Sequence, residues 1–221
     1  MDIAEILSKV DHTLLKPACT GAEIEALCRE ALEFHTASVC VPPVYVRAAA
    51  ELLGGRVPVC TVVGFPNGYD TAASKVFQAK DAIINGADEI DMVIHIGAVK
   101  DGRYDAVAEE IAAVREACDG RILKVIVETA LLTRDEKIAL CRVVTETGAD
   151  FIKTSTGFAG GGATFEDVQL IKEHIGPNVK IKASGGIATL EDAAEFIRLG
   201  CARLGASRLV ALAKARKGDA V

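Results

Sequence analysis

A single lysine at the end of a short apolar run is the strongest candidate in the sequence for a catalytic residue. Residues 151–157 read FIKTSTG, so an apolar pair leads to Lys153 and small hydroxyl residues follow it. This pattern is typical of a buried strand that presents one amine at its carboxyl end, before a loop able to hold an anion. Lysine is rarely buried without a partner. A desolvated lysine amine can attack a carbonyl and form a Schiff base, and we expect that chemistry at Lys153.

Two further charged residues lie in apolar runs of the same kind. Residues 179–183 read VKIKA, and strand side chains alternate, so Lys180 and Lys182 share one face. If the strands of Lys153 and Lys182 are neighbours, ammonium groups about 5 Å apart repel by roughly 3 kcal/mol at an effective dielectric of about 20. One of the two amines then loses its proton more readily. A carboxylate such as Asp91 can keep the other amine charged and carry protons.

Each of these charged residues also has a purely structural interpretation. Asp91 and Lys182 could form a buried ion pair that only stabilises the fold, but two lysines that compete for one acid favour catalysis. Lys180 and Glu89 each lie two residues earlier on their predicted strands, where we expect a structural pair at the bottom of the sheet.

Length and charge restrict the classes of partner. The chain has 221 residues and a formal net charge of −6, and half of its residues are hydrophobic. This length fits one α/β barrel of roughly 200–250 residues. An acidic chain lacks the broad positive field that nucleic acids or anionic membranes require, so any bound phosphate must be held by a local pocket. We therefore expect a small-molecule substrate, and neither a nucleic acid nor a membrane as partner.

The cysteines and histidines favour neither a metal nor a cofactor. The seven cysteines are irregularly spaced without a CxxC pair, and the four histidines show no metal-ligand spacing. The residues after Met1 carry charge from Asp2 onward and lack the basic and apolar regions of a signal peptide. No apolar run approaches the about 20 residues of a membrane-spanning helix. We expect a cytoplasmic protein whose cysteines stay reduced.

Strand-like apolar runs alternate with longer amphipathic segments, and this order predicts the fold. The predicted strands cover residues 12–15, 37–41, 57–63, 88–94, 121–127, 150–153, 179–183 and 203–205. The predicted helices cover residues 2–8, 21–34, 43–53, 71–85, 103–117, 134–147, 164–175, 189–199 and 206–216. Residues 85–91 and 147–153 repeat a Gly-Ala-Asp step before a strand, which indicates parallel strands with crossover helices.

Eight such units predict a (β/α)₈ TIM barrel with a short extra N-terminal helix, forming a single domain over residues 1–221. An open doubly wound sheet is the alternative, but no GxGxxG sequence follows the first predicted strand.

Loops of small residues follow the predicted strands that carry the lysines. Gly185 and Gly186 follow the seventh strand, and Gly205 and Ser207 follow the eighth, at the start of a helix. Loops at these two positions of a TIM barrel often bind phosphate through backbone N–H groups and a helix N-terminus. Gly157 can close the same site from a third side. We therefore expect a phosphate site on these residues.

Two other loop or strand-end features have weaker interpretations. The run Gly160, Gly161 and Gly162 is expected to supply loop flexibility rather than ligand contacts. Cys40 ends the second predicted strand, where it either lines the pocket or packs in the core.

Several strings together resemble a known family. They are Asp11 to Pro17, Gly64 to Pro66, Glu89 to Val93, the 151–157 string, Lys182 to Ile187, and Arg203 to Ser207. These residues, which span nearly the whole chain, are similar to those of the 2-deoxyribose-5-phosphate aldolase family, class I aldolases built on a (β/α)₈ barrel. The KTSTG and KASGG strings carry most of the resemblance.

The resemblance implies an activity and roles for individual residues. The reaction would be reversible cleavage of 2-deoxy-D-ribose 5-phosphate to D-glyceraldehyde 3-phosphate and acetaldehyde. Lys153 would form the Schiff base, and Asp91 and Lys182 would relay protons. Arg208 stands where many relatives have a second small hydroxyl residue. We also expect a homo-oligomer, either a dimer or a tetramer.

Two other functions remain open from the sequence alone. One is a Schiff-base aldolase that acts on a different phosphosugar or a keto-acid, and product analysis separates it from the first reading. The other is a phosphosugar sensor, which would bind tightly without a covalent adduct and would leave Lys153 unexplained.

Overall fold

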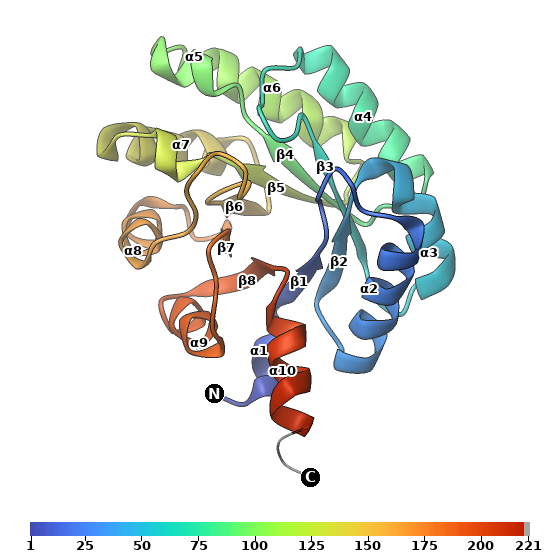
Figure 1. Ribbon diagram of the computed structural model, residues 1–221. Coiled ribbons are helices and arrows are strands. Elements are labelled where there is room, and N and C mark those ends of the chain that lie inside the picture. Colours follow the sequence, from blue (N-terminus) through green and yellow to red (C-terminus); the bar gives the residue numbers. More distant parts are fainter. Residues whose placement is uncertain (219–221) are drawn as a thin grey trace.

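The computed structural model describes residues 1–218, which form a closed barrel of eight parallel strands surrounded by helices (Figure 1). The strands are β1 (Val10–Thr13), β2 (Ser38–Val41), β3 (Val59–Val63), β4 (Glu89–Val93), β5 (Ile122–Ile126), β6 (Phe151–Lys153), β7 (Lys180–Ser184) and β8 (Cys201–Ala206). They follow one another around the barrel in chain order, and β8 pairs with β1. The predicted (β/α)₈ architecture is confirmed.

Helices connect successive strands and cover the outside of the barrel. They are α1 (Ile3–Leu7), α2 (Gly21–Phe34), α3 (Val46–Leu53), α4 (Ala72–Ile84), α5 (Ile96–Lys100), α6 (Tyr104–Ala117), α7 (Arg134–Glu146), α8 (Phe165–His174), α9 (Leu190–Arg198) and α10 (Leu209–Gly218), with short 3₁₀ turns η1 (Pro43–Tyr45) and η2 (Thr129–Leu131). The short N-terminal helix is the expected extra element. Capping boxes begin α2 and α7, with Thr20 capping α2 and Thr133 capping α7.

The apolar core lies between the strands and the helices. Ile90 and Met92 of β4 belong to this layer, in the same buried cluster as helix residues such as Ile111. Because side chains alternate along a strand, Glu89 and Asp91 of the same strand point into the barrel. Ala, Val, Ile and Leu form most of the outer layer, in keeping with a sequence that has no tryptophan and only 5% aromatic residues.

Several predicted boundaries are wrong in ways that affect the site. β1 covers Val10–Thr13 rather than residues 12–15, because Val10 pairs with Leu204 at the start of the β1–β8 ladder. β8 covers Cys201–Ala206 rather than residues 203–205, and the last helix begins at Leu209 rather than at residue 206. Gly205 therefore lies inside a strand, not in a loop.

Two short helical elements have no counterpart in the predicted set, namely α5 and η2. Both lie in the connections that leave the carboxyl ends of strands. Among the described residues, no helix is both long and apolar enough to span a membrane. The single domain over residues 1–221 stays a prediction, and residues 219–221 lie outside the described part of the chain.

Candidate active site

Lys153 and Lys182 lie side by side inside the barrel. They are register partners on the adjacent strands β6 and β7. Both amines donate to the same carboxylate oxygen, Oδ2 of Asp91, at 2.7 Å from Lys153 and 2.6 Å from Lys182. Lys182 and Asp91 have no exposed surface, and Lys153 is 2% exposed. The structure therefore places two lysine amines and one carboxylate in direct contact.

Lys124 on β5 is a third lysine in this cluster. It is the register partner of Asp91, and its amine donates to Asp91 Oδ1 at 2.8 Å. The same amine lies 2.6 Å from Glu89 Oε2 and 3.7 Å from Asp11 Oδ2. Lys182 also forms an ion pair with Asp11. The cluster is thus a network in which every carboxylate contacts more than one basic group.

Arg203 on β8 closes the network toward the bottom of the barrel. Its guanidinium pairs with Asp11 and, at 3.0 Å, with Glu89. The pairing of β7 with β8 is irregular between Ile181 and Lys182, so that Lys182 faces Arg203. Such an irregularity re-aims a side chain, and here it accompanies an arginine that points toward the barrel axis.

The network fixes the charge of its members. Burial alone would raise the pKa of the Asp91 carboxyl, but the three ammonium groups around it outweigh burial and hold this pKa well below its usual range. Burial alone would lower the pKa of Lys182, but Asp11 and Asp91 raise it above the usual range. Burial would likewise lower the pKa of Lys124, but the carboxylates around it, Asp91 first, outweigh burial and raise this pKa well above its usual value. Asp91 is therefore ionised, and Lys182 and Lys124 are charged.

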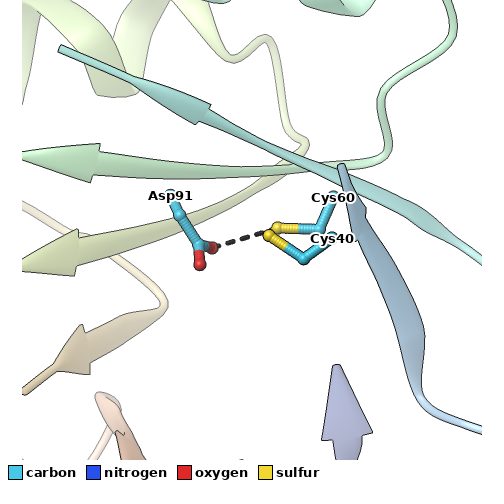
Figure 2. A group of neighbouring side chains, drawn as sticks. All are labelled: Cys40, Cys60 and Asp91. Carbon is cyan, nitrogen blue, oxygen red and sulfur yellow. Dashed lines mark hydrogen bonds between the residues drawn. The ribbon is translucent and has the colours of Figure 1, made fainter. Parts of the chain in front are cut away.

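Two cysteines complete the inner wall beside Asp91 (Figure 2). Cys40 and Cys60 are register partners on β2 and β3 and are fully buried. The Cys60 thiol donates to Asp91 Oδ1 at 3.2 Å and accepts from Lys124 at 3.3 Å. Burial, the neighbouring Cys40 thiol and the Asp91 carboxylate together raise the pKa of Cys60 well above its usual value. Cys60 is therefore a neutral thiol that packs against the carboxylate.

Cysteine and carboxylate atoms come close enough to ligate a metal in two places. Cys40, Cys60 and Asp91 form one group, and Asp11, Cys60 and Glu89 form the other, with ligand atoms within 4.8 Å of one another. The carboxylate oxygens of both groups already receive ammonium or guanidinium hydrogens. A cation would have to displace those ion pairs. We therefore interpret both groups as parts of the ion-pair network.

A cavity of about 450 Å³ opens above this network at the carboxyl ends of the strands. Its lining includes every residue for which the sequence indicated a phosphate site: Gly157, Gly185, Gly186, Gly205 and Ser207. Lys16 and Arg208 also line it and supply positive charge. Lys153 lies three residues before Thr156 of the lining. The cavity wall is thus rich in small residues, and it continues in sequence from the strands that carry Lys153 and Lys182, although neither lysine is itself part of the lining.

Glycines set the shape of this rim. Gly157, Gly185 and Gly186 have positive φ values of 82°, 79° and 75°, which side chains rarely adopt. A Cβ atom on Gly162 would lie 2.6 Å from the Gly185 carbonyl oxygen. Gly162 therefore allows two loop backbones to pack closely, which differs from the loop flexibility expected for it.

Gly205 has a different role from the loop residue that the sequence indicated. A Cβ atom at this position would lie 2.5 Å from Ser184 Oγ and 3.2 Å from Lys182 Cε. The glycine leaves room for the Lys182 side chain to reach Asp91. Its position in the strand therefore serves the buried network as well as the cavity lining.

Comparison with known proteins agrees with this geometry. The sequence profile of the family described as DeoC/LacD family aldolase matches residues 6–213. The chain belongs to this family. It is 55% identical over 217 residues to a deoxyribose-phosphate aldolase of Streptococcus agalactiae, with 98% of this chain and 97% of the relative covered. It is 56% identical over 214 residues to a deoxyribose-phosphate aldolase of Clostridium botulinum, with 97% of each chain covered.

A solved structure shares the fold of this aldolase at high similarity. The deoxyribose phosphate aldolase of Aeropyrum pernix, described as having a unique tetrameric structure, superposes with a TM-score of 0.89 at 30% identity. The alignment covers 98% of this chain and 92% of the other.

Three charged residues of the aldolase network were missed from the sequence. Asp11 fell outside the predicted first strand, which was placed two residues too late. Arg203 was placed at the start of a strand that in fact begins at Cys201. Lys124 lies in the middle of the apolar string ILKVI, a pattern that predicts a buried lysine as the 151–157 string does for Lys153.

The structural pair expected between Lys180 and Glu89 does not form. Among the ion pairs of the described residues, Glu89 pairs with Lys124 and Arg203. Lys180 is exposed, and its amine lies 5.7 Å from the centre of the Phe151 ring. The register explains this, because Lys180 is the partner of Phe151 at the bottom of the barrel while Glu89 faces β5.

Proposed function

We propose that this aldolase reversibly cleaves 2-deoxy-D-ribose 5-phosphate to D-glyceraldehyde 3-phosphate and acetaldehyde through a Schiff base on Lys153. The names of relatives at 55% and 56% identity over almost the full chain support the substrate. The observation that carries the mechanism is the contact of Lys153 and Lys182 with one oxygen of Asp91, beneath a cavity rimmed by glycines.

Charge balance supports Lys153 as the nucleophile. The basic groups of the network are Lys124, Lys153, Lys182 and Arg203, and its carboxylates are Asp11, Glu89 and Asp91. The network is therefore neutral when one of its four basic groups has lost its proton. Lys153 contacts one carboxylate, Lys182 contacts two and Lys124 contacts three, so the Lys153 amine is the one held by the fewest ion pairs.

Access supports the same assignment. The Lys153 side chain is 3% exposed, whereas those of Lys124 and Lys182 are 0% exposed. An amine that attacks a substrate carbonyl must be reachable by the substrate, and of the three lysines only Lys153 has any exposed side-chain surface.

The reaction follows from a neutral Lys153 amine. The amine adds to the C1 aldehyde of the open-chain sugar, and loss of water gives an iminium ion. The iminium accepts the electron pair of the C2–C3 bond as the C3 hydroxyl loses its proton, which releases glyceraldehyde 3-phosphate. Protonation of the remaining enamine at C2 and hydrolysis release acetaldehyde and restore Lys153.

Asp91 and Lys182 are suited to move the protons that these steps require. Asp91 is ionised and shares one oxygen with both lysines, so a proton on Lys182 is one carboxylate away from Lys153. General acid–base catalysis of this kind typically contributes about 10²–10⁴-fold in rate.

The cavity rim is suited to hold the 5-phosphate. Backbone N–H groups beside the glycines Gly157, Gly185 and Gly186 can approach an anion closely, and Ser207 adds a hydroxyl just before α10. Gly205 belongs to the same lining. Arg208 adds a local positive charge in a chain whose net charge is −6.

Borohydride reduction in the presence of substrate tests this function. The parent enzyme should convert deoxyribose 5-phosphate to the two products and yield a reduced adduct on the peptide that contains Lys153. Lys153→Arg keeps the positive charge but removes the nucleophile, so trapping and cleavage should both vanish. An adduct on Lys182 or Lys124 would overturn the assignment, and different products would point to another substrate.

The same assay with a chelator tests the expectation that no metal takes part. A Schiff base already provides the electron sink, so activity should be unchanged. Activity that disappears with the chelator and returns with a divalent cation would contradict the Schiff-base mechanism.

We also propose that the protein forms a homo-oligomer, a dimer or a tetramer, in which the outer face of α4 contacts a second copy. Phe77 and Ile84 are 72% and 79% exposed and lie seven residues apart, on one face of the helix. The tetrameric relative from Aeropyrum pernix supports self-association. Light scattering should show a smaller particle for Phe77→Lys/Ile84→Lys than for the parent. Leu212→Lys on α10 is the control, and a monomeric parent would contradict the proposal.

A further inference from the structure

Glu128 has an unusual backbone for a buried residue. It follows β5 and is fully buried, with φ 57° and ψ 66° in the left-handed region. Of the non-glycine residues with positive φ in the described chain, His35 and Asp119 are exposed and only Glu128 is buried. Such backbone conformations persist where the surroundings enforce them, and they concentrate at functional sites.

The Glu128 carboxylate is also buried without a basic partner. Among the ion pairs of the described residues, none includes Glu128. A buried carboxylate is costly unless it is paired or hydrogen-bonded. Its hydrogen bonds go to one residue: Oε2 accepts from the Thr156 backbone N–H at 3.1 Å and from the Thr156 hydroxyl at 2.5 Å.

Thr156 transmits this contact to the cavity wall. Its hydroxyl oxygen accepts from the Phe158 N–H at 3.0 Å. Thr156, Gly157 and Phe158 all line the cavity, whereas Glu128 does not. The backbone next to Glu128 is also linked to the loop after β6, because Thr129 N–H donates to the Thr154 carbonyl at 2.8 Å. Glu128 therefore acts on the cavity through Thr156.

The direction of the hydrogen bond from the Thr156 hydroxyl decides which substrate groups this part of the cavity wall can bind. A threonine hydroxyl has one proton and two acceptor lone pairs. In this structure the proton goes to Glu128 and one lone pair to Phe158. The remaining lone pair can only accept, so Thr156 can bind a hydroxyl of the substrate but cannot donate to its phosphate or carbonyl.

We propose that Glu128 is a positioning residue that orients Thr156 to accept a hydrogen bond from a substrate hydroxyl, which makes the site selective for hydroxylated aldehydes. This inference rests on the proposed aldolase function. The Glu128 side chain hydrogen-bonds to Thr156 and does not line the cavity, so its removal should affect the hydroxylated part of the substrate and spare imine formation with acetaldehyde.

The test compares Glu128→Gly with Glu128→Gln. Glycine adopts the left-handed backbone without strain, so Glu128→Gly removes the carboxylate but not the turn. Its kcat/KM for deoxyribose 5-phosphate should fall about 100-fold, while borohydride trapping with acetaldehyde alone changes less than about threefold. Glu128→Gln keeps an acceptor for Thr156 and should lose less than about tenfold.

A second measurement reads specificity directly. In the condensation direction, the parent should prefer glyceraldehyde over propanal as acceptor, and Glu128→Gly should lose most of that preference. Thr156→Val should lose it as well, and the double variant should be no worse than either single one.

The outcomes separate this inference from the proposed function. Equal losses of acetaldehyde trapping and of cleavage in Glu128→Gly, or an unchanged acceptor preference, would overturn the role of Glu128. A parent enzyme that does not cleave deoxyribose 5-phosphate would instead overturn the proposed substrate.

Discussion

The barrel interior and the cavity rim differ in residue type, because the interior holds charged side chains and the rim holds mainly small residues. The interior holds charged side chains on strands, and all of them except Lys153 contact two or more groups of opposite charge, as Asp91 does with its lysines. The rim above it is rich in small residues, and three of them, Gly157, Gly185 and Gly186, have left-handed backbones. The comparison shows that strands hold the lysine amines in place, while bare loop backbone leaves the room that the proposed phosphate site requires.

The interior also departs from the usual filling of such barrels. Branched aliphatic side chains commonly form the layers inside a TIM barrel. Here Lys124 and Lys182 take those positions and are fully buried. Removing one partner from a buried ion pair is strongly destabilising, because the other charge is left uncompensated. Changes to the interior should therefore damage rate and stability together, and changes to the rim should affect mainly substrate binding.

The largest effect is expected from Lys182→Leu in the interior. It removes the ammonium shared by Asp11 and Asp91, so kcat/KM should fall by about 10²–10⁴-fold as the proton path is lost. Both carboxyls have a pKa below the usual range when folded, so they stabilise the fold at neutral pH, and this stability is lost as pH falls through those values. Without Lys182 the folded pKa values rise, and acid unfolding should begin at a higher pH.

Circular dichroism during acid titration measures that shift. Lys182→Arg keeps the charge and serves as the control for stability. An acid unfolding midpoint equal to that of the parent would mean that Lys182 does not hold the two carboxylates ionised.

A smaller and more selective effect is expected from Gly186→Ala at the rim. The new methyl group would lie 4.0 Å from the nearest protein atom outside its chain neighbours, Gly162 Cα, so it fits the protein but obstructs the approach of a phosphate to the backbone. KM for deoxyribose 5-phosphate should rise about tenfold, with little change for unphosphorylated deoxyribose.

Gly160→Ala provides the matched control for backbone strain. Gly160 has φ 78°, close to the 75° of Gly186, and a Cβ atom there would have no neighbour within 4 Å. It does not line the cavity. Equal changes in KM for the two variants, or equal losses on both sugars, would mean that strain rather than phosphate access is responsible.

The smallest effect is expected from His12, which points away from the interior on the strand that carries Asp11. Burial lowers the pKa of His12 below 6.5, and the hydrogen bond to Glu30 at 2.7 Å offsets this only in part. The folded state therefore resists protonation that the unfolded chain accepts. Stability should fall as pH drops below about 6.5.

Thermal unfolding at pH 7.5 and at pH 5.5 measures this loss, which should amount to about 1–3 °C. His12→Gln should show a smaller difference between the two pH values. A parent enzyme with equal midpoints at both pH values would contradict the neutral, buried state of His12.

Much of the fold and part of the site could be predicted from the sequence, since each depends on local pattern. The lysines Lys153 and Lys182 stood out because a charge in a short apolar run has few structural explanations. Chain order made their strands neighbours. The rim glycines could be found because the phosphate loops of such barrels occupy fixed positions.

The remainder depended on register and three-dimensional packing. Asp11 joins the network only because Val10 pairs with Leu204 and moves the first strand two residues earlier. The reason for a glycine at position 205 can be seen only in the structure, where the Lys182 side chain passes next to it. The contact of Glu128 with Thr156 joins residues 28 positions apart and has no local signature in the sequence.

The closure of the barrel by β1 and β8 has a consequence for synthesis of the chain. Residues 10–13 are made well before their partner strand at residues 201–206, which follows only after the other six strands of the barrel. Until then the growing sheet has two open edges, which are sites for pairing with other chains. A chain that stops before Cys201 should therefore aggregate or be degraded rather than persist as a smaller folded protein.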